Sequence, residues 1–152
     1  MKTIALKLLT ALALTVPAFA AEKEHSHDKK AEGPNGGRVL TAVEPHLEFL
    51  VTKDRKVEII ALSKDLKPAK MSGQVISVTA GDRSKPTKLD LKEDGDKLVS
   101  SNALPEGNGF PVSVSIKPGA SGKAVYEKFN LDMSKCPECK NPEYACICTH
   151  SH

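Results

Sequence analysis

Tryptophan is absent from this chain of 152 residues, and only four phenylalanines and two tyrosines are present. So few aromatic side chains leave little material for the stacking platforms on which proteins bind single-stranded nucleic acid. Charge offers no substitute, because removal of the first twenty residues, which hold Lys2 and Lys7 but no acid, lowers the formal net charge from +3 to +1. A chain so close to neutral has no electrostatic basis for binding nucleic acid or anionic lipid. We therefore expect neither as a partner.

The motifs that mark common enzyme classes are also missing. The chain has no G-x-S-x-G, no phosphate loop of the G-x-x-x-x-G-K-[ST] type, no H-E-x-x-H and no G-x-G-x-x-G. Its acidic residues are dispersed among lysines, as on an ordinary solvated surface. We expect a binding protein and not an enzyme.

Residues 1–20 have the parts of a secretory signal peptide. Lys2 and Lys7 precede an apolar run over residues 8–16. Ala18-Phe19-Ala20 then supplies an A-x-A cleavage site. The run is too short and wrongly flanked for a membrane span, and a buried N-terminal helix is the weaker alternative. We expect a mature chain that begins at Ala21, is periplasmic or secreted, and has no membrane span.

The residues that follow divide into an arm and a β domain. Residues 21–35 are polar, charged and without periodicity, which predicts a disordered arm containing His25 and His27. Over residues 36–133, apolar and polar residues alternate with a period of two, the pattern of half-buried antiparallel strands. The alternating stretches are residues 46–52, 55–63, 74–80, 87–93, 97–103, 111–118 and 124–133.

Turn residues between these stretches support the same interpretation. Asp94-Gly95 separates two of them and favours a tight hairpin with positive φ. Seven or eight short strands at this spacing predict an all-β fold, an antiparallel β-sandwich of immunoglobulin-like shape. His46 and Glu48 fall on the strand face opposite Leu47 and Phe49, so we expect both to face solvent or a shallow groove.

Cysteine is absent until the end of the chain, where four residues follow in quick succession: Cys136, Cys139, Cys146 and Cys148. The C-x-x-C spacing lets a tight turn aim two thiolates at one metal ion. The pattern C-x-C-x-H-x-H, which includes His150 and His152, places alternate ligands on one side of an extended segment. We predict that residues 134–152 form a Cys/His tail that binds Zn²⁺ or Cu(I), with the two histidines as alternate ligands.

Two other uses of the thiols remain open. An exported chain with an even number of cysteines could form local disulfides, each closing at most thirteen residues. Such a disulfide would contribute about 3 kcal/mol or less to the free energy of unfolding. It would also crosslink the tail internally and not to the sandwich. The chain would then be a periplasmic interaction module. A thiol–disulfide exchanger built on C-x-x-C would need a helix N-terminus in a βαβ setting, which the sequence does not predict.

The N-terminal arm also contains two histidines one residue apart, in His25-Ser26-His27-Asp28. Two imidazoles and a carboxylate at this spacing form a weak, exposed site for a divalent ion, although a solvated polar arm is an equal alternative. Because the alternation ends near Met133, we expect the sandwich to fold without the tail. We also expect the tail, which has no core of its own, to become ordered only around an ion.

The segment 33–59 resembles a β domain of periplasmic components of heavy-metal efflux systems, including some membrane-fusion adaptors. Those domains open with G-P-x-G-G-R next to a His-rich arm. The matching residues are Gly33, Pro34, Gly36, Gly37, Arg38, His46 and Glu48. The chain lacks the long helical hairpin and lipoyl-like regions of the adaptors. The resemblance implies a small, stand-alone domain that handles metal ions, with a metal-efflux or metal-accepting periplasmic protein as its partner.

Overall fold

The computed structural model describes residues 30–119 and 121–148. The predicted signal peptide lies outside the described residues, as do His25, His27, His150 and His152. Within the described ranges, no helix has the length and apolar character that a membrane span requires. The elements are β1 (Arg38–Leu40), β2 (His46–Val51), β3 (Val57–Leu62), β4 (Val75–Ala80), β5 (Thr87–Leu89), β6 (Leu91–Asp94), β7 (Lys97–Ser100), β8 (Phe110–Lys117), β9 (Val125–Leu131) and the 3-10 turn η1 (Glu143–Ala145).

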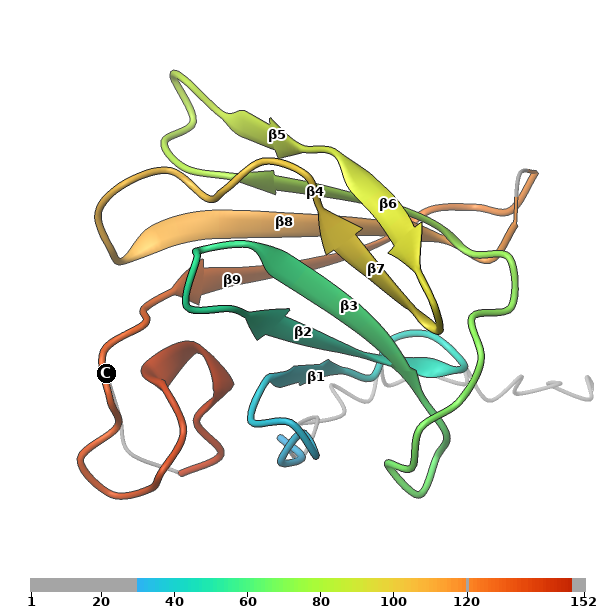
Figure 1. Ribbon diagram of the computed structural model, residues 1–152, viewed down its shortest axis with the longest axis horizontal. Coiled ribbons are helices and arrows are strands. Elements are labelled where there is room, and N and C mark those ends of the chain that lie inside the picture. Colours follow the sequence, from blue (N-terminus) through green and yellow to red (C-terminus); the bar gives the residue numbers. More distant parts are fainter. Residues whose placement is uncertain (1–29, 120, 149–152) are drawn as a thin grey trace, which may run out of the picture.

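The strands form two antiparallel sheets (Figure 1). One sheet has the order β1-β2-β3-β7-β6, and the other has the order β5-β4-β8-β9. Every strand pair within them is antiparallel. This confirms the all-β, antiparallel sandwich that the alternating pattern predicts.

The predicted strand 87–93 is in fact two strands in two sheets. β5 pairs with β4, whereas β6 pairs with β7. The chain changes sheets at Asp90, whose N–H and carbonyl bond to Asn102 Oδ1 and to the N–H of Ser101, at 2.9 and 2.8 Å. Alternation continues through Leu89 and Leu91, so the sequence pattern alone does not mark the change.

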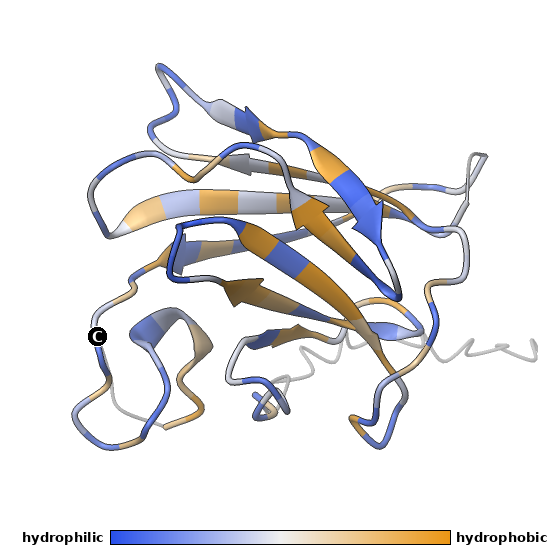
Figure 2. Cartoon of the chain, viewed as in Figure 1, coloured by the Kyte–Doolittle hydropathy of each residue, from blue (hydrophilic) through white to orange (hydrophobic). Residues whose placement is uncertain are grey.

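The core lies between the sheets and contains the apolar member of each alternating pair. Figure 2 shows this as orange bands that alternate with pale ones along β8, where Val112, Val114 and Ile116 are buried. Phe49 of β2 meets Phe129 of β9 edge-on, with ring centroids 5.2 Å apart, and so joins the two sheets. Each fully buried side chain of this size contributes about 1.5–3 kcal/mol.

The turn predicted at Asp94-Gly95 is present as a two-residue hairpin loop. Asp94 and Lys97 are paired across β6 and β7, and Gly95 has a φ of 63°. Only glycine adopts this left-handed conformation without steric cost, so the residue fits the turn.

The segment after β9 differs from the expected tail, because it packs onto the sandwich. Tyr144 and Ala145 are buried members of the core. The Tyr144 ring lies edge-on to Phe49 at 6.2 Å, and its hydroxyl accepts a hydrogen bond from the N–H of Val51 at 3.1 Å. The backbone N–H of Tyr144 donates to the carbonyl of Asp132 at 2.9 Å. Alternation did not indicate this contact, because a single aromatic residue in a polar stretch carries no periodicity.

Replacement of Tyr144 should therefore destabilise the whole domain. We expect Tyr144→Ala to lower the free energy of unfolding by about 3–5 kcal/mol, as for other large aromatic side chains removed from a core. Tyr144→Phe keeps the ring and loses one hydrogen bond, so about 1 kcal/mol is expected. Urea denaturation measures both. A Tyr144→Ala protein as stable as wild type would show that the segment does not pack on the core.

Candidate metal centre

The first half of the site is a tight turn around the sulfur of Cys136. An isolated bridge between Lys135 and Pro142 closes the loop, and the N–H of Cys136 donates to the carbonyl of Asn141 at 3.0 Å. The backbone N–H groups of Glu138 and Cys139 both donate to the Cys136 sulfur. The backbone N–H groups of the C-P-E-C turn therefore surround the sulfur of its first cysteine.

The second half returns the chain to the same point. The turn η1 redirects it, and the N–H of Cys146 donates to the carbonyl of Glu143 at 3.2 Å. Cys146 is extended, with φ −68° and ψ 134°, and its sulfur accepts a hydrogen bond from the N–H of Cys148 at 3.3 Å. Because Tyr144 is fixed in the core, Cys146 is placed by the sandwich and not by the loop alone.

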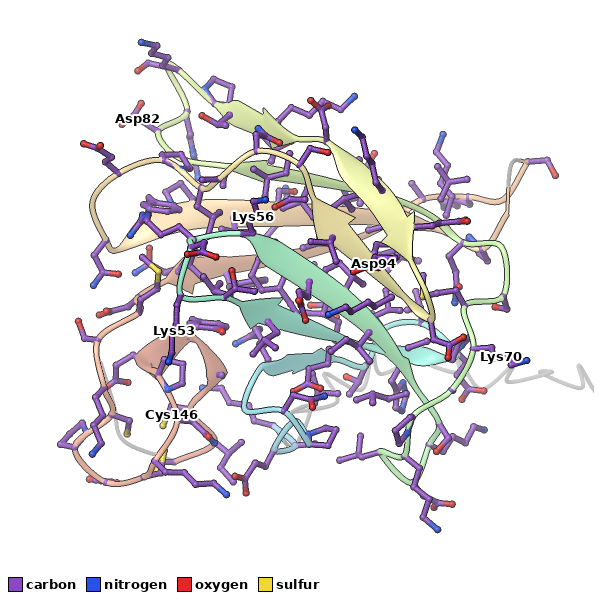
Figure 3. All side chains as sticks on the ribbon, in the orientation of Figure 1. Lys53, Lys56, Lys70, Asp82, Asp94 and Cys146 are labelled. Carbon is purple, nitrogen blue, oxygen red and sulfur yellow. The ribbon has the colours of Figure 1, made fainter. Side chains whose placement is uncertain are left out.

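These two halves bring all four predicted cysteines together. Their sulfur atoms lie within 4.8 Å of one another, with 3.3 Å between Cys136 and Cys146 and 3.8 Å between Cys139 and Cys146. Four sulfurs around a tetrahedral zinc ion, at about 2.3 Å from the metal, would be about 3.8 Å apart. No disulfide joins these four cysteines, and Figure 3 shows sulfur atoms gathered in the loop at Cys146. The cluster has the dimensions of a four-thiolate metal site.

The cluster has a buried side and an open side. Cys136 and Cys146 are 1% and 3% exposed, whereas Cys139 and Cys148 are only half-buried. An ion at the centre would thus be covered by the sandwich on one side. On the other side it would be reached past the two half-buried sulfurs.

The surroundings of the cysteines shift the pKa values of their thiols in different directions. Burial acts to raise the pKa of Cys136, but hydrogen bonds from the Glu138 and Cys139 N–H groups and from Cys146 lower it to about 7. Burial, followed by the hydrogen bond to Cys136, raises the pKa of Cys146. The pKa of Cys148 is raised to about 12, first by the hydrogen bond between Cys148 and Cys146 and then by burial. Of these three thiols, Cys136 is therefore the one that ionises at the lowest pH.

A buried carboxylate supports the neighbouring glycine-rich loop. Glu48 is fully buried, and it accepts hydrogen bonds from Asn35 N, Asn35 Nδ2 and Gly37 N at 2.9, 2.8 and 2.8 Å. A Cβ atom at Gly33 would overlap the Glu48 carboxylate, and one at Gly37 would lie 2.5 Å from the Phe49 carbonyl oxygen. The expectation that Glu48 faces solvent was wrong, because the loop folds over this face of β2. His46, its neighbour on that face, is half-buried, with Nδ1 2.9 Å from the Val43 carbonyl oxygen.

The chain next to this glycine-rich loop contacts the cysteine loop. Glu32 forms an ion pair with Lys140 at 3.1 Å and accepts a hydrogen bond from Asn141 Nδ2 at 3.4 Å. Arg38 lies with its guanidinium 4.8 Å from the centre of the Phe129 ring, and its Nη1 donates to the Tyr144 carbonyl at 3.3 Å. The start of the described chain therefore supports the cysteine loop from the side.

The sequence predicts the four thiols but not the roles of the residues that position them. Tyr144, Glu48 and Arg38 perform this positioning. Glu48 and Arg38 belong to the segment that resembles the efflux domains, whereas no motif marks Tyr144. A scan against protein-family models finds no match, and no significant similarity to a curated protein or to a solved structure is found. The resemblance to heavy-metal efflux domains stays a prediction.

Replacement of Glu48 should test the support of the glycine-rich loop. In Glu48→Gln an amide NH₂ replaces one of the oxygens that accept N–H groups, so we expect a loss of about 2–3 kcal/mol in the free energy of unfolding. Glu44→Gln is the matched control. Glu44 is exposed and forms an ion pair with exposed Lys64, at 2.9 Å, and such pairs contribute about 0–1 kcal/mol. Equal stability of the two variants in urea would contradict the assigned role of Glu48.

Proposed function

We propose that this chain is an exported metal-binding protein that sequesters or delivers a thiophilic ion, Zn²⁺ or Cu(I), at the four-cysteine cluster. The supporting observation is the gathering of four cysteine sulfurs within 4.8 Å of one another, with no disulfide among them. Thiolate ligands favour Zn²⁺ and Cu(I) over Mg²⁺, Ca²⁺ or Mn²⁺, whose preferred ligands are oxygens. In this proposal the chain acts by binding and not by catalysis.

The open side of the cluster favours a cargo ion that is exchanged. An acceptor could replace Cys139 and Cys148 one at a time while Cys136 and Cys146 still hold the metal. A second function, a structural ion, is favoured by Tyr144, because the same loop is packed into the core. Closed four-thiolate zinc sites are typical of structural roles. Exchange of the bound ion with a chelator decides between them: a cargo ion leaves while the protein stays folded, and a structural ion leaves only with unfolding.

The proposal includes export of the chain and a partner protein that takes part in metal efflux or accepts the metal. Export is supported by the signal-peptide pattern of residues 1–20, and mass measurement of the secreted chain would place the cleavage site. A metal-efflux or metal-accepting periplasmic protein is the partner implied by the resemblance around residues 33–59. An interaction module with oxidised cysteines would instead yield protein without titratable thiols when it is isolated under anaerobic conditions.

The reduced protein should take up one thiophilic ion per chain. We expect Cys136→Ser with Cys139→Ser to weaken Zn²⁺ or Cu(I) binding by more than about 100-fold, since loss of outer partners alone costs 10–100-fold. Glu138→Gln is the control within the same turn, because it keeps the backbone N–H that bonds to Cys136. Competition with a chromophoric chelator measures the affinities. The cluster would not be a metal site if wild type bound no more tightly than the variant with serine at all four positions.

Metal affinity should rise steeply with pH. A thiol must lose its proton to become a ligand, and the pKa values of Cys136, at about 7, and Cys148, at about 12, place this loss at neutral pH and above. At pH 7 Cys146 and Cys148 are protonated and Cys136 is half ionised, so binding should release about two or more protons per ion. Calorimetry in buffers of different ionisation enthalpy counts these protons. Affinity that is constant between pH 6 and 8 would indicate oxygen ligands instead.

A further inference from the structure

The outer face of the sheet β5-β4-β8-β9 carries a row of polar side chains that crosses all four strands. From β5 to β9, its paired members are Lys88, Thr79, Ser113 and Lys128. The residues that flank Thr79 and Ser113 in their strands are buried. Because alternate residues of a strand point to opposite faces, the row faces away from the core. It has a cation at each end and two hydroxyl groups between them.

Part of this row lies in a hollow between the β4–β5 turn and the strands β8 and β9. Figure 1 shows this turn at the same end of the sheet as the start of β8 and the end of β9. The hollow has a volume of about 530 Å³ and is lined by the members of the row in β4, β8 and β9, by Arg83 and Pro86 of the turn, and by Pro111 of β8. Sites for small molecules typically have about 300–1,000 Å³, so the hollow has room for one.

Hydrogen bonds hold the turn that forms one wall of the hollow. Asp82 Oδ1 accepts hydrogen bonds from the N–H and the hydroxyl of Ser84, at 2.7 and 2.6 Å. The carbonyl of Asp82 accepts one from the N–H of Lys85 at 3.1 Å. The N–H of Gly81 donates to the carbonyl of Pro111 at 3.1 Å and so joins the turn to β8. The turn therefore has a defined position against the sheet, and its carboxylate is engaged within the turn.

The charged side chains that line the hollow are all basic. Arg83 and Lys128 belong to its described lining, and no aspartate or glutamate does. Three other hollows on the described surface are each lined by at least one carboxylate. The small net charge of the whole chain therefore does not describe this face, which favours an anion. An arginine fork and a lysine ammonium are the usual side chains that bind phosphate oxygens, and the hydroxyls of Thr79 and Ser113 can donate further hydrogen bonds.

We propose that this hollow binds a small, soluble phosphate monoester, with the phosphate between Arg83 and Lys128 and the organic part against Pro86 and Pro111. A phosphate monoester carries a charge of about −1.5 to −2 at pH 7, which matches two cations better than a single carboxylate does. A phosphate group alone would fill only a small part of the hollow, so an organic part has space beside it. No cysteine belongs to the described lining, so the site goes beyond the proposed function and does not depend on it.

Titration of the full chain with glucose 6-phosphate, inorganic phosphate and glucose, followed by the chemical shifts of backbone amides in NMR spectra, tests the site. We expect glucose 6-phosphate to bind most tightly, inorganic phosphate more weakly and glucose not at all. The largest shifts should occur in residues 81–86 and 111–113, because these residues form two walls of the hollow.

The variant Arg83→Gln with Lys128→Gln should weaken the binding of glucose 6-phosphate at least about tenfold, because hydrogen bonds from charged donors are lost. Both residues are exposed, so the fold should be retained. Lys53→Gln with Lys67→Gln is the matched control. It removes the same charge from two exposed positions in the turns that flank β3, outside the hollow, and should leave the affinity unchanged.

Four outcomes would overturn the proposal. An equal loss of affinity in the two double variants would mean general attraction between charges, without a site. Equal affinity for glucose and glucose 6-phosphate would remove the role of the phosphate. Shifts confined to residues outside the hollow would place the ligand elsewhere, and the wild-type protein alone gives this result. Binding to vesicles of phosphatidylcholine that contain phosphatidic acid, without binding to glucose 6-phosphate, would replace the soluble ester by a lipid headgroup.

Discussion

The edge-on contact between Tyr144 and Phe49 joins the cysteine loop to the sandwich. Phe49 also meets Phe129 from the opposite sheet, so one ring connects both sheets and the loop. Because the backbone at Tyr144 is fixed by this contact and by the carbonyl of Asp132, the turn that follows must deliver Cys146 to one place. The cysteine cluster thus takes its position from core packing, which acts over short distances, and not from the conformational preferences of the loop alone.

Hydrogen bonds support the same loop from the other side. Glu48 holds the glycine-rich loop through three N–H groups, and Glu32, at the start of that loop, contacts Lys140 and Asn141. The carbonyl of Asn141 then receives the N–H of Cys136. A buried carboxylate on β2 is thereby connected to the first thiol of the cluster through polar contacts at each end and through the chain between Glu32 and Asn35. Such a network stabilises only while all its members are satisfied.

The sequence predicts most of the fold, because a strand with one buried face alternates apolar and polar residues with a period of two. It does not predict the change of sheet at Asp90, since both sheets demand the same alternation there. It misplaces Glu48, because strand alternation assumes that the polar face meets water, and here a loop covers it. The clustering of the four cysteines is predicted from their spacing in the sequence, because two short C-x-x-C and C-x-C segments can bring their sulfur atoms to one point. Tyr144 escapes prediction, because a single long-range contact leaves no local pattern.

The contact of Glu32, near the start of the described chain, with Lys140 and Asn141 of the cysteine loop has a practical consequence for handling the protein. A fusion partner or purification tag attached after His152 would be joined four residues beyond Cys148, next to the cysteine loop. An oligohistidine tag placed there would add metal ligands of high local concentration beside the cluster. Metal content and stoichiometry would then describe the tagged hybrid, so the tag has to be removed, or replaced by one without histidine, before the ion is identified.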